Sequence, residues 1–307
     1  MTDTLRLFLV QANPVVGDIA GNTAMARDWW AKGKAAGADM VALTEMFVTG
    51  YQTQDLILKP AFQSAAQAAI ETLARDCADG PALGIGAPAV KDGKLFNAWW
   101  VLQGGRATAT VLKHHLPNDA VFDEKRVFSS ADVAGPYVVN GVRIGTPICE
   151  DARHPDVAET LQETGAEILL VPNGSPYHRG KPNLRLNLMV QRVVETGLPL
   201  VYLNMVGGQD DQVFDGSSMV LNPGGHLAVQ MAQFDEAAEL VTFRRTPGGW
   251  KADEGTKAPI PPSARRTIAP ASSGWATTCA RPGSGRRFSA CRAGSIPPSS
   301  RPLPPTP

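Results

Sequence analysis

Two hydrophobic patterns alternate along the chain up to about residue 257. Apolar residues at helical spacing cover residues 22–36, 61–77, 155–164 and 183–196. Short apolar runs, typical of buried strands, cover residues 5–11, 40–43, 82–87, 98–102, 107–112, 142–148, 167–171, 199–205, 217–221 and 226–230. Strands that alternate with helices predict an α/β fold in which helices pack on a sheet.

Two glycine-containing turns refine this prediction. Gly104-Gly105 separates two neighbouring strand candidates, and residues 222–225 separate the last two. Connections this short join antiparallel strands. The sheet is therefore predicted to be mixed rather than purely parallel, within a single domain that spans residues 4–257.

The composition changes near residue 262. Residues 263–307 are rich in Pro, Ser, Arg and Gly and show no apolar periodicity. Such a segment cannot bury enough apolar surface to offset the entropy of ordering it. We predict a disordered tail over residues 258–307.

Charge and cysteine content exclude several classes of function. The 307 residues contain 29 Lys and Arg and 29 Asp and Glu, so the net charge is zero. This balance argues against binding of nucleic acid or an anionic membrane through the overall electrostatic field.

No apolar run reaches the ~20 residues that span a bilayer, and the start lacks the layout of a secretion signal. The four cysteines form no CxxC pair and no metal-like cluster, which favours free thiols in the cytoplasm.

Three reactive side chains each follow a predicted buried strand. Glu45 follows residues 40–44, Lys113 follows residues 107–112, and Cys149 follows residues 142–148. Because strand ends at one edge of an α/β sheet converge, we expect the three to meet in one pocket. A carboxylate can take the thiol proton, while an ammonium and the backbone N–H after the cysteine stabilise an oxyanion. The sulfur is then expected to be ionised.

Each residue also has a simpler interpretation. A single cysteine after a strand is commonly a small buried hydrophobe. A single Glu or Lys at a strand end is commonly a solvated loop residue. The conjunction of all three favours a nucleophilic site.

The surrounding residues resemble the nitrilase superfamily of carbon–nitrogen hydrolases. Residues 44–51, 112–118 and 147–151 look like its three motifs, which carry Glu45, Lys113 and Cys149 in that order. Further segments are similar to the amino-terminal glutaminase domain of glutamine-dependent NAD synthetases. These segments are residues 122–126, 173–177, 204–210 and 214–218.

The resemblance implies a four-layer αββα sandwich and a Glu45–Lys113–Cys149 triad that acts on L-glutamine. It also implies a role for Glu124, which would orient Lys113 and keep it charged. The alternative for Glu124 is a surface acid paired with Lys125 or Arg126.

The resemblance places further residues around the substrate. Ser175 and Lys181 match positions that hold glutamine, and Glu150 belongs to the same expected set. The alternative for Ser175 and Lys181 is a loop serine and a solvated lysine. Tyr51 is expected either to line the pocket or to belong to the hydrophobic core. Asp119 stands where the family usually has Tyr; it either binds the substrate ammonium or lies in a rearranged loop.

The family continues into a synthetase domain whose phosphate-binding motif Ser-Gly-Gly-Ile-Asp-Ser is absent here. Read out of frame, the codons of residues 291–297 permit that motif. We hypothesise that the tail is a shifted reading frame across the ATP loop, with the shift near residues 262–266; the alternative is an unrelated tail. ATP and Mg²⁺ would belong to the absent domain, and the glutaminase domain would need no cofactor or metal.

The function predicted from these observations is release of ammonia from glutamine through a thioester on Cys149, for amidation of deamido-NAD. Synthesis of NAD is not expected from this chain alone. A homo-oligomer is expected from the resemblance. The alternatives are a stand-alone amidase for another small amide and a catalytically idle fragment that assembles with partner subunits.

Overall fold

A computed structural model describes residues 2–260 of the chain. Most of the predicted tail lies outside these residues, and with it the hypothesis of a shifted frame. The helices are α1 (Ile19–Ala35), α2 (Pro60–Asp76), α3 (Glu124–Val127), α4 (Pro155–Glu163) and α5 (Lys181–Thr196), with 3₁₀ turns η1 (Gln54–Leu58), η2 (Cys149–Arg153) and η3 (Pro223–Gly225). Among the described residues, no helix is long and apolar enough to cross a membrane.

The strands form two large sheets and one small hairpin. The first sheet has the order β15-β14-β1-β2-β3-β4-β5, the second has the order β13-β12-β9-β8-β7-β6, and β10 pairs with β11. The first sheet contains β1 (Thr4–Gln11), β2 (Met40–Ala42), β3 (Ala82–Lys91), β4 (Lys94–Gln103), β5 (Arg106–Leu112), β14 (Ala237–Thr246) and β15 (Gly249–Ala252). The second contains β6 (Tyr137–Val139), β7 (Val142–Gly145), β8 (Ile168–Asn173), β9 (Leu200–Asn204), β12 (Met219–Asn222) and β13 (His226–Gln230), while the hairpin is β10 (Val206–Gln209) with β11 (Gln212–Asp215).

Both large sheets are mixed, as predicted from the turns. The central strands β1, β2 and β3 of the first sheet run parallel, as do β7, β8 and β9 of the second. The flanking strands are antiparallel, including β14 on β1 and β12 on β9. The two parallel cores bring several strand ends to the same edge of the molecule.

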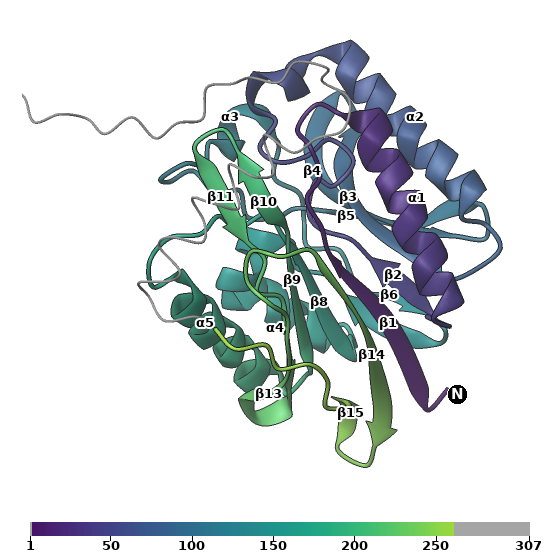
Figure 1. Cartoon of the computed structure of the whole chain (residues 1–307), viewed down its shortest axis with the longest axis vertical. Coiled ribbons are helices and arrows are strands. Elements are labelled where there is room, and N and C mark those ends of the chain that lie inside the picture. Colours follow the sequence, from purple (N-terminus) through teal and green to yellow (C-terminus); the bar gives the residue numbers. More distant parts are fainter. Residues whose placement is uncertain (1, 261–307) are drawn as a thin grey trace, which may run out of the picture.

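The molecule has four layers, with the sheets inside and helices outside. Figure 1 shows α1 and α2 on one side, α4 and α5 on the other, and the strands between them. The alternation of β1 explains this arrangement: Leu5, Leu7 and Leu9 enter the core between the sheets, while Val10 faces the helices. Burying such a side chain contributes about 1.5–3 kcal/mol.

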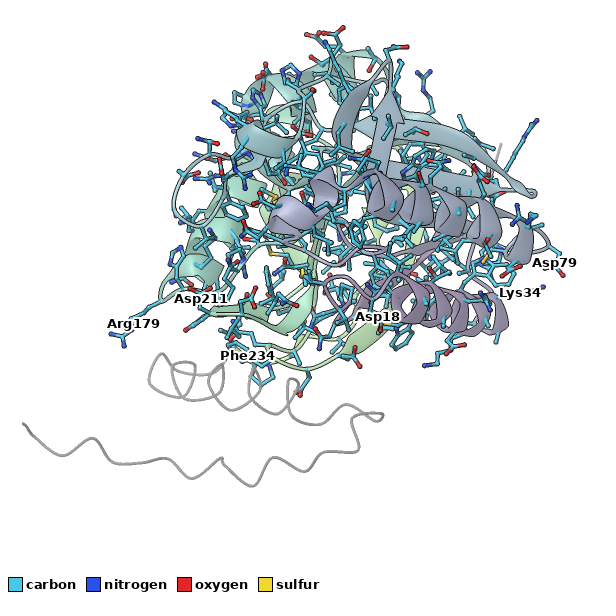
Figure 2. All side chains as sticks on the ribbon, turned by 90° about the horizontal axis from the view of Figure 1, so that it is seen from above. Asp18, Lys34, Asp79, Arg179, Asp211 and Phe234 are labelled. Atoms are coloured by element: carbon cyan, nitrogen blue, oxygen red, sulfur yellow. The ribbon has the colours of Figure 1, made fainter. Side chains whose placement is uncertain are left out.

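Local sequence signals account for the ends of the outer helices. The Asp18 carboxylate accepts a hydrogen bond from the Gly21 N–H (2.9 Å) and so caps the start of α1. Figure 2 shows Asp18 and Lys34 at opposite ends of this helix, with Lys34 next to Asp79; their charged atoms are 3.0 Å apart. Gly197, with φ of 70°, ends α5 in the left-handed conformation expected of a C-terminal glycine.

The structure corrects several predicted strands. The strand predicted over residues 142–148 ends at Gly145, so three irregular residues precede Cys149. The strand before Lys113, predicted to be buried, is the edge strand β5, and most of its side chains are exposed. Strands β6, β10, β11, β14 and β15 were not predicted. They are short or lie toward the margins of the sheets, where polar side chains mask the alternation.

Gly86 on β3 holds the segment that follows β2. Its N–H donates to the Thr44 carbonyl (3.2 Å), and its own carbonyl accepts from the Val48 N–H (3.1 Å). A Cβ atom on Gly86 would lie 2.2 Å from the Met46 nitrogen and 2.6 Å from the Glu45 carbonyl carbon. Only glycine allows this approach of two backbones.

We expect Gly86→Ala to lower the free energy of unfolding by about 1–3 kcal/mol, because the added methyl group meets backbone that cannot move aside easily. Gly135→Ala is the matched control, since a Cβ there has no neighbour within 4 Å in the described part of the chain and its φ is not positive. Urea unfolding of both variants measures the difference. Equal stability of the two would contradict the close approach.

Candidate active site

A buried ammonium group lies between two carboxylates at the edge of the first sheet. Lys113 Nζ is 2.7 Å from Glu45 Oε1 and 2.8 Å from Glu124 Oε2. The Lys113 side chain is 0% exposed. Glu124 is thus paired with Lys113 and not with its neighbours Lys125 or Arg126, so the alternative of a surface acid is wrong. A buried charge needs such partners because desolvation alone would cost several kcal/mol.

Both carboxylate oxygens of Glu45 accept hydrogen bonds. Besides Lys113, Oε1 accepts a hydrogen bond from Asn97 Nδ2 (2.8 Å), and Oε2 accepts one from the Gly174 N–H (2.7 Å). Asn97 lies on β4 and also donates to Glu124 Oε1 (3.0 Å). Since Gly174 follows β8, the carboxylate of Glu45 joins the edges of both sheets.

Cys149 begins η2 with φ of 48°. This left-handed conformation is uncommon for a non-glycine residue and clusters at functional sites. The residue is partly exposed, because it lines a cavity. Glu45 and Lys113 both act on the charge of its thiol, so Cys149 lies near the edge where these two side chains meet.

The electrostatics of the cluster favour a charged lysine and a neutral thiol. Burial alone would lower the pKa of Lys113, but the carboxylates of Glu124 and Glu45 outweigh it and the pKa is raised well above its ordinary value. Burial, together with Glu45, raises the pKa of Cys149 well above its ordinary value, and Lys113 offsets this only in part. The raised pKa argues against the expectation that the resting sulfur is ionised. Burial also raises the pKa of Glu124, against the opposing effect of Lys113.

Cys149 opens into a small, partly open cavity between η2 and α5. Three of the predicted substrate-binding residues line it with the cysteine, namely Glu150, Ser175 and Lys181. The other lining residues are Phe122, Arg153, Asn173, Leu184, Arg185, Leu188, Met189 and Tyr202. The cavity thus combines apolar walls with three basic side chains and one acid. Such a site suits a small polar ligand with a net negative end.

The loop that carries Ser175 is fixed by a buried ion pair. Arg185 Nη1 lies 2.6 Å from Asp215 Oδ1, and both side chains are almost fully buried. Arg185 Nη2 also donates to the Ser175 carbonyl (2.6 Å), while Asn204 Oδ1 accepts from the Ser175 N–H (2.9 Å). Lys181, by contrast, has no carboxylate of residues 2–260 within salt-bridge distance, and burial and then Arg185 lower its pKa.

Tyr51 and Asp119 lie differently from the other predicted residues. Tyr51 is buried behind the cluster: its hydroxyl donates to Glu124 Oε1 (2.9 Å), and its ring leaves no room for a Cβ on Gly174. It stacks on Phe122, a wall of the cavity, with 6.2 Å between ring centroids. Asp119 is exposed and is not among the residues that line the cavity. The structure does not bring Asp119 to Cys149.

Asp151 links the segments that carry Lys113 and Cys149. Its Oδ1 accepts hydrogen bonds from the N–H groups of His114 (3.2 Å) and His115 (2.7 Å), and its Oδ2 accepts one from Ile148 (2.9 Å). Burial raises its pKa to about 6, although these donors oppose the shift. Asp151 therefore sets the spacing between the lysine and the nucleophile.

Sequence reasoning missed Asn97, Asp151 and Arg185 as residues of the site. Asn97 had a signal, since it interrupts an apolar run between Phe96 and Ala98. Asp151 lies in the motif at residues 147–151, but its position there predicts no role for it. Arg185 is one of several basic residues near α5, and only its three-dimensional pairing with Asp215 distinguishes it.

Comparison with known proteins agrees with this geometry. Residues 6–245 match the family model of carbon–nitrogen hydrolases, and the chain belongs to that family. It is 58% identical, over 252 residues, to a glutamine-dependent NAD(+) synthetase of Rhodobacter capsulatus, and the match covers 82% of this chain and 46% of that protein. The chain thus spans about half the length of the curated relatives it matches.

Solved structures support the fold. Glutamine-dependent NAD+ synthetase from Acinetobacter baumannii superposes with a TM-score of 0.86 at 29% identity, covering 91% of this chain and 52% of that one. An amidase from Nesterenkonia sp. superposes with a TM-score of 0.69 at 23% identity, covering 80% and 92%. The nitrilase-type sandwich predicted from sequence is confirmed.

We expect Asp151→Asn to lower the free energy of unfolding by about 1–3 kcal/mol, since an amide NH₂ would face one of the N–H donors that the carboxylate accepts. Asp253→Asn is the matched control, because Asp253 makes an exposed pair with Arg244, which is worth about 0–1 kcal/mol. Thermal unfolding followed by circular dichroism compares them. An Asp151 variant as stable as the control would show that the three hydrogen bonds contribute little.

Alkylation tests the neutral resting thiol. The pH midpoint for modification of Cys149 by iodoacetamide should lie above the ~8.5 of an ordinary thiol. Glu45→Gln should lower that midpoint, because it removes a carboxylate that raises the pKa of the thiol. Peptide mass mapping separates Cys149 from the other cysteines. A midpoint below 7 in the unmodified chain would mean that the sulfur is ionised at rest.

Proposed function

We propose that the chain hydrolyses the side-chain amide of L-glutamine to glutamate and ammonia through a thioester on Cys149. One observation carries the proposal: a carboxylate, a buried ammonium and a thiol from distant parts of the chain meet beside a charged cavity. These groups can perform acyl transfer to a thiol. The membership of the carbon–nitrogen hydrolase family agrees with this reaction class.

In the first half of the reaction, the Cys149 sulfur attacks the amide carbon while its proton passes to Glu45. Lys113 and the backbone N–H of Glu150 stabilise the resulting oxyanion. Transfer of the proton from Glu45 to the nitrogen then breaks the C–N bond and releases ammonia. Proton transfer of this kind contributes ~10²–10⁴ in rate, and one oxyanion donor contributes ~10²–10³.

In the second half, water attacks the thioester carbon and Glu45 accepts the water proton. The same oxyanion contacts form again, the C–S bond breaks, and the proton returns to the sulfur. Glutamate leaves and the thiol is neutral as before. Glu124 takes no part in bond making; it holds Lys113 charged, and Tyr51 and Asn97 fix Glu124 in turn.

The charges around the cavity favour an α-amino acid amide over an uncharged amide. Lys181 lines the cavity and is assigned to an α-carboxylate, and Glu150, whose Oε2 pairs with Arg153 Nη1 (3.2 Å), is assigned to an α-ammonium. Arg185 is already engaged by Asp215 and by the Ser175 carbonyl, so its role is to shape the wall. Asp119 is exposed, and we assign it no contact with the substrate.

We propose further that the ammonia serves the amidation of deamido-NAD. The support is the 58% identity to half of a glutamine-dependent NAD(+) synthetase. ATP and Mg²⁺ would act at the synthetase site, and residues 2–260 are assigned the ammonia-producing step alone. The expected homo-oligomer and the cytoplasmic location stay predictions.

Substitution of the triad tests the reaction. Cys149→Ala should abolish ammonia release from glutamine, and Glu45→Gln should lower kcat by ~10²-fold or more. A coupled assay for ammonia measures both. Undiminished activity of the Cys149 variant would refute the nucleophile. Covalent labelling of Cys149 by a glutamine-derived electrophile separates an active chain from an idle fragment, which would not be labelled selectively.

A second experiment tests the substrate. Lys181→Met should raise KM for glutamine by about tenfold or more, since one charged hydrogen bond is worth ~1.5–3 kcal/mol, while activity on acetamide should change little. Lys251→Met, at an exposed position of β15, is the control. Equal or better turnover of acetamide by the unmodified chain would favour the stand-alone amidase.

A further inference from the structure

Three side chains able to bind a metal ion meet on the surface next to the candidate active site. His114 and His115 directly follow Lys113, and Asp156 lies in the first turn of α4. Their candidate ligand atoms all lie within 4.8 Å of one another. His115 Nε2 donates a hydrogen bond to the two Asp156 oxygens (3.1 and 3.0 Å), and an ion bound there would displace this proton; His114 Nε2 is 4.0 Å from Oδ2. Ligands about 2.0–2.2 Å from a tetrahedral ion are about 3.3–3.5 Å apart, which is close to this spacing.

The hydrogen bond on the other side of His114 prepares its ring for an ion. His114 Nδ1 lies 2.5 Å from the Ala131 carbonyl oxygen. A carbonyl oxygen only accepts, so Nδ1 carries the hydrogen and Nε2 of the neutral ring presents a lone pair toward Asp156. Metal-bound histidines commonly donate their second N–H to a carbonyl in this way. A lone pair that faces a carboxylate is stabilised when a cation lies between them.

The cluster is also fixed before any ion arrives. The Asp151 carboxylate accepts hydrogen bonds from the backbone N–H groups of both histidines. The His115 ring stacks on His154, with 3.9 Å between ring centroids. Because the Ala131 carbonyl restricts the His114 ring and the stack on His154 restricts the His115 ring, binding would require little further ordering. The ligand side chains are 30%, 27% and 55% exposed for His114, His115 and Asp156, so an ion can enter from solvent.

We propose that His114, His115 and Asp156 form a binding site for a divalent ion of the zinc class, with water in the remaining positions. Two imidazoles and one carboxylate suit Zn²⁺ and its first-row neighbours better than Mg²⁺ or Ca²⁺, which prefer oxygen ligands. The bound ion joins the segment after Lys113 to the helix that follows the Cys149 turn. The metal–ligand bonds would thus connect the two segments in addition to the hydrogen bonds of Asp151.

Calorimetric titration of the metal-free chain with ZnCl₂ tests the site. The unmodified chain should bind one ion, and His115→Gln and Asp156→Asn should each weaken binding at least ~10-fold. Zn²⁺ should also raise the unfolding temperature of the unmodified chain and leave that of the two variants nearly unchanged. His226→Gln is the matched control, since His226 Nε2 makes a surface pair with Glu254 (2.8 Å) and should not affect binding.

The variants also separate this site from the cysteines, which are alternative zinc ligands. Every thiol remains in His115→Gln and Asp156→Asn, so zinc held by cysteine would bind these variants as tightly as the unmodified chain. That result would overturn the proposal, as would the absence of saturable binding. Asp156 is exposed and its replacement is conservative, so Asp156→Asn is expected to keep the fold. Absorption of a Co²⁺ complex without a thiolate charge-transfer band would support the assigned ligands.

Discussion

The ammonium of Lys113, enclosed between Glu45 and Glu124, is the interaction on which the rest of the site depends. A buried charge without partners is strongly destabilising, so each member of the cluster keeps the others in place. Glu45 follows β2, Lys113 follows β5 and Glu124 begins α3. Through Gly174 the same cluster reaches the second sheet. One electrostatic requirement therefore aligns four segments that are distant in the sequence.

The regular parts of the fold could be predicted because hydrophobic periodicity and turn chemistry are local properties. Strand β1, helix α2 and the end of α5 at Gly197 lie close to the predicted positions. The convergence of Glu45 and Lys113 followed from a general property of strand ends in α/β sheets. Strand β14 was missed because its pairing with β1 is a contact between the two ends of the domain. The alternation of Val241 and Phe243 within it is masked by polar neighbours such as Glu239 and Arg244.

The site was less predictable, since its support comes from pairs that only folding creates. Asn97 on β4 donates hydrogen bonds to Glu45 and Glu124. Arg185 on α5 forms an ion pair with Asp215 on β11. The spacing of the cysteines predicts no metal ligands. His115 and Asp156 could not be predicted as neighbours, because they lie 41 positions apart in the chain. The ionisation of Cys149 was misjudged for a similar reason: a strand-end position carries no information about how closely carboxylates surround it.

The neutral thiol has a consequence for the order of events. Glu45 and Glu124 both raise the pKa of the Cys149 thiol, so a free thiolate beside them is disfavoured. Transfer of the proton from Cys149 to Glu45 avoids this cost, because it moves a negative charge from oxygen to sulfur without increasing the total. Attack on a carbonyl then carries the charge onward to an oxygen near Lys113. In such a site the thiolate has no reason to accumulate before the substrate is bound, and its formation is coupled to bond making.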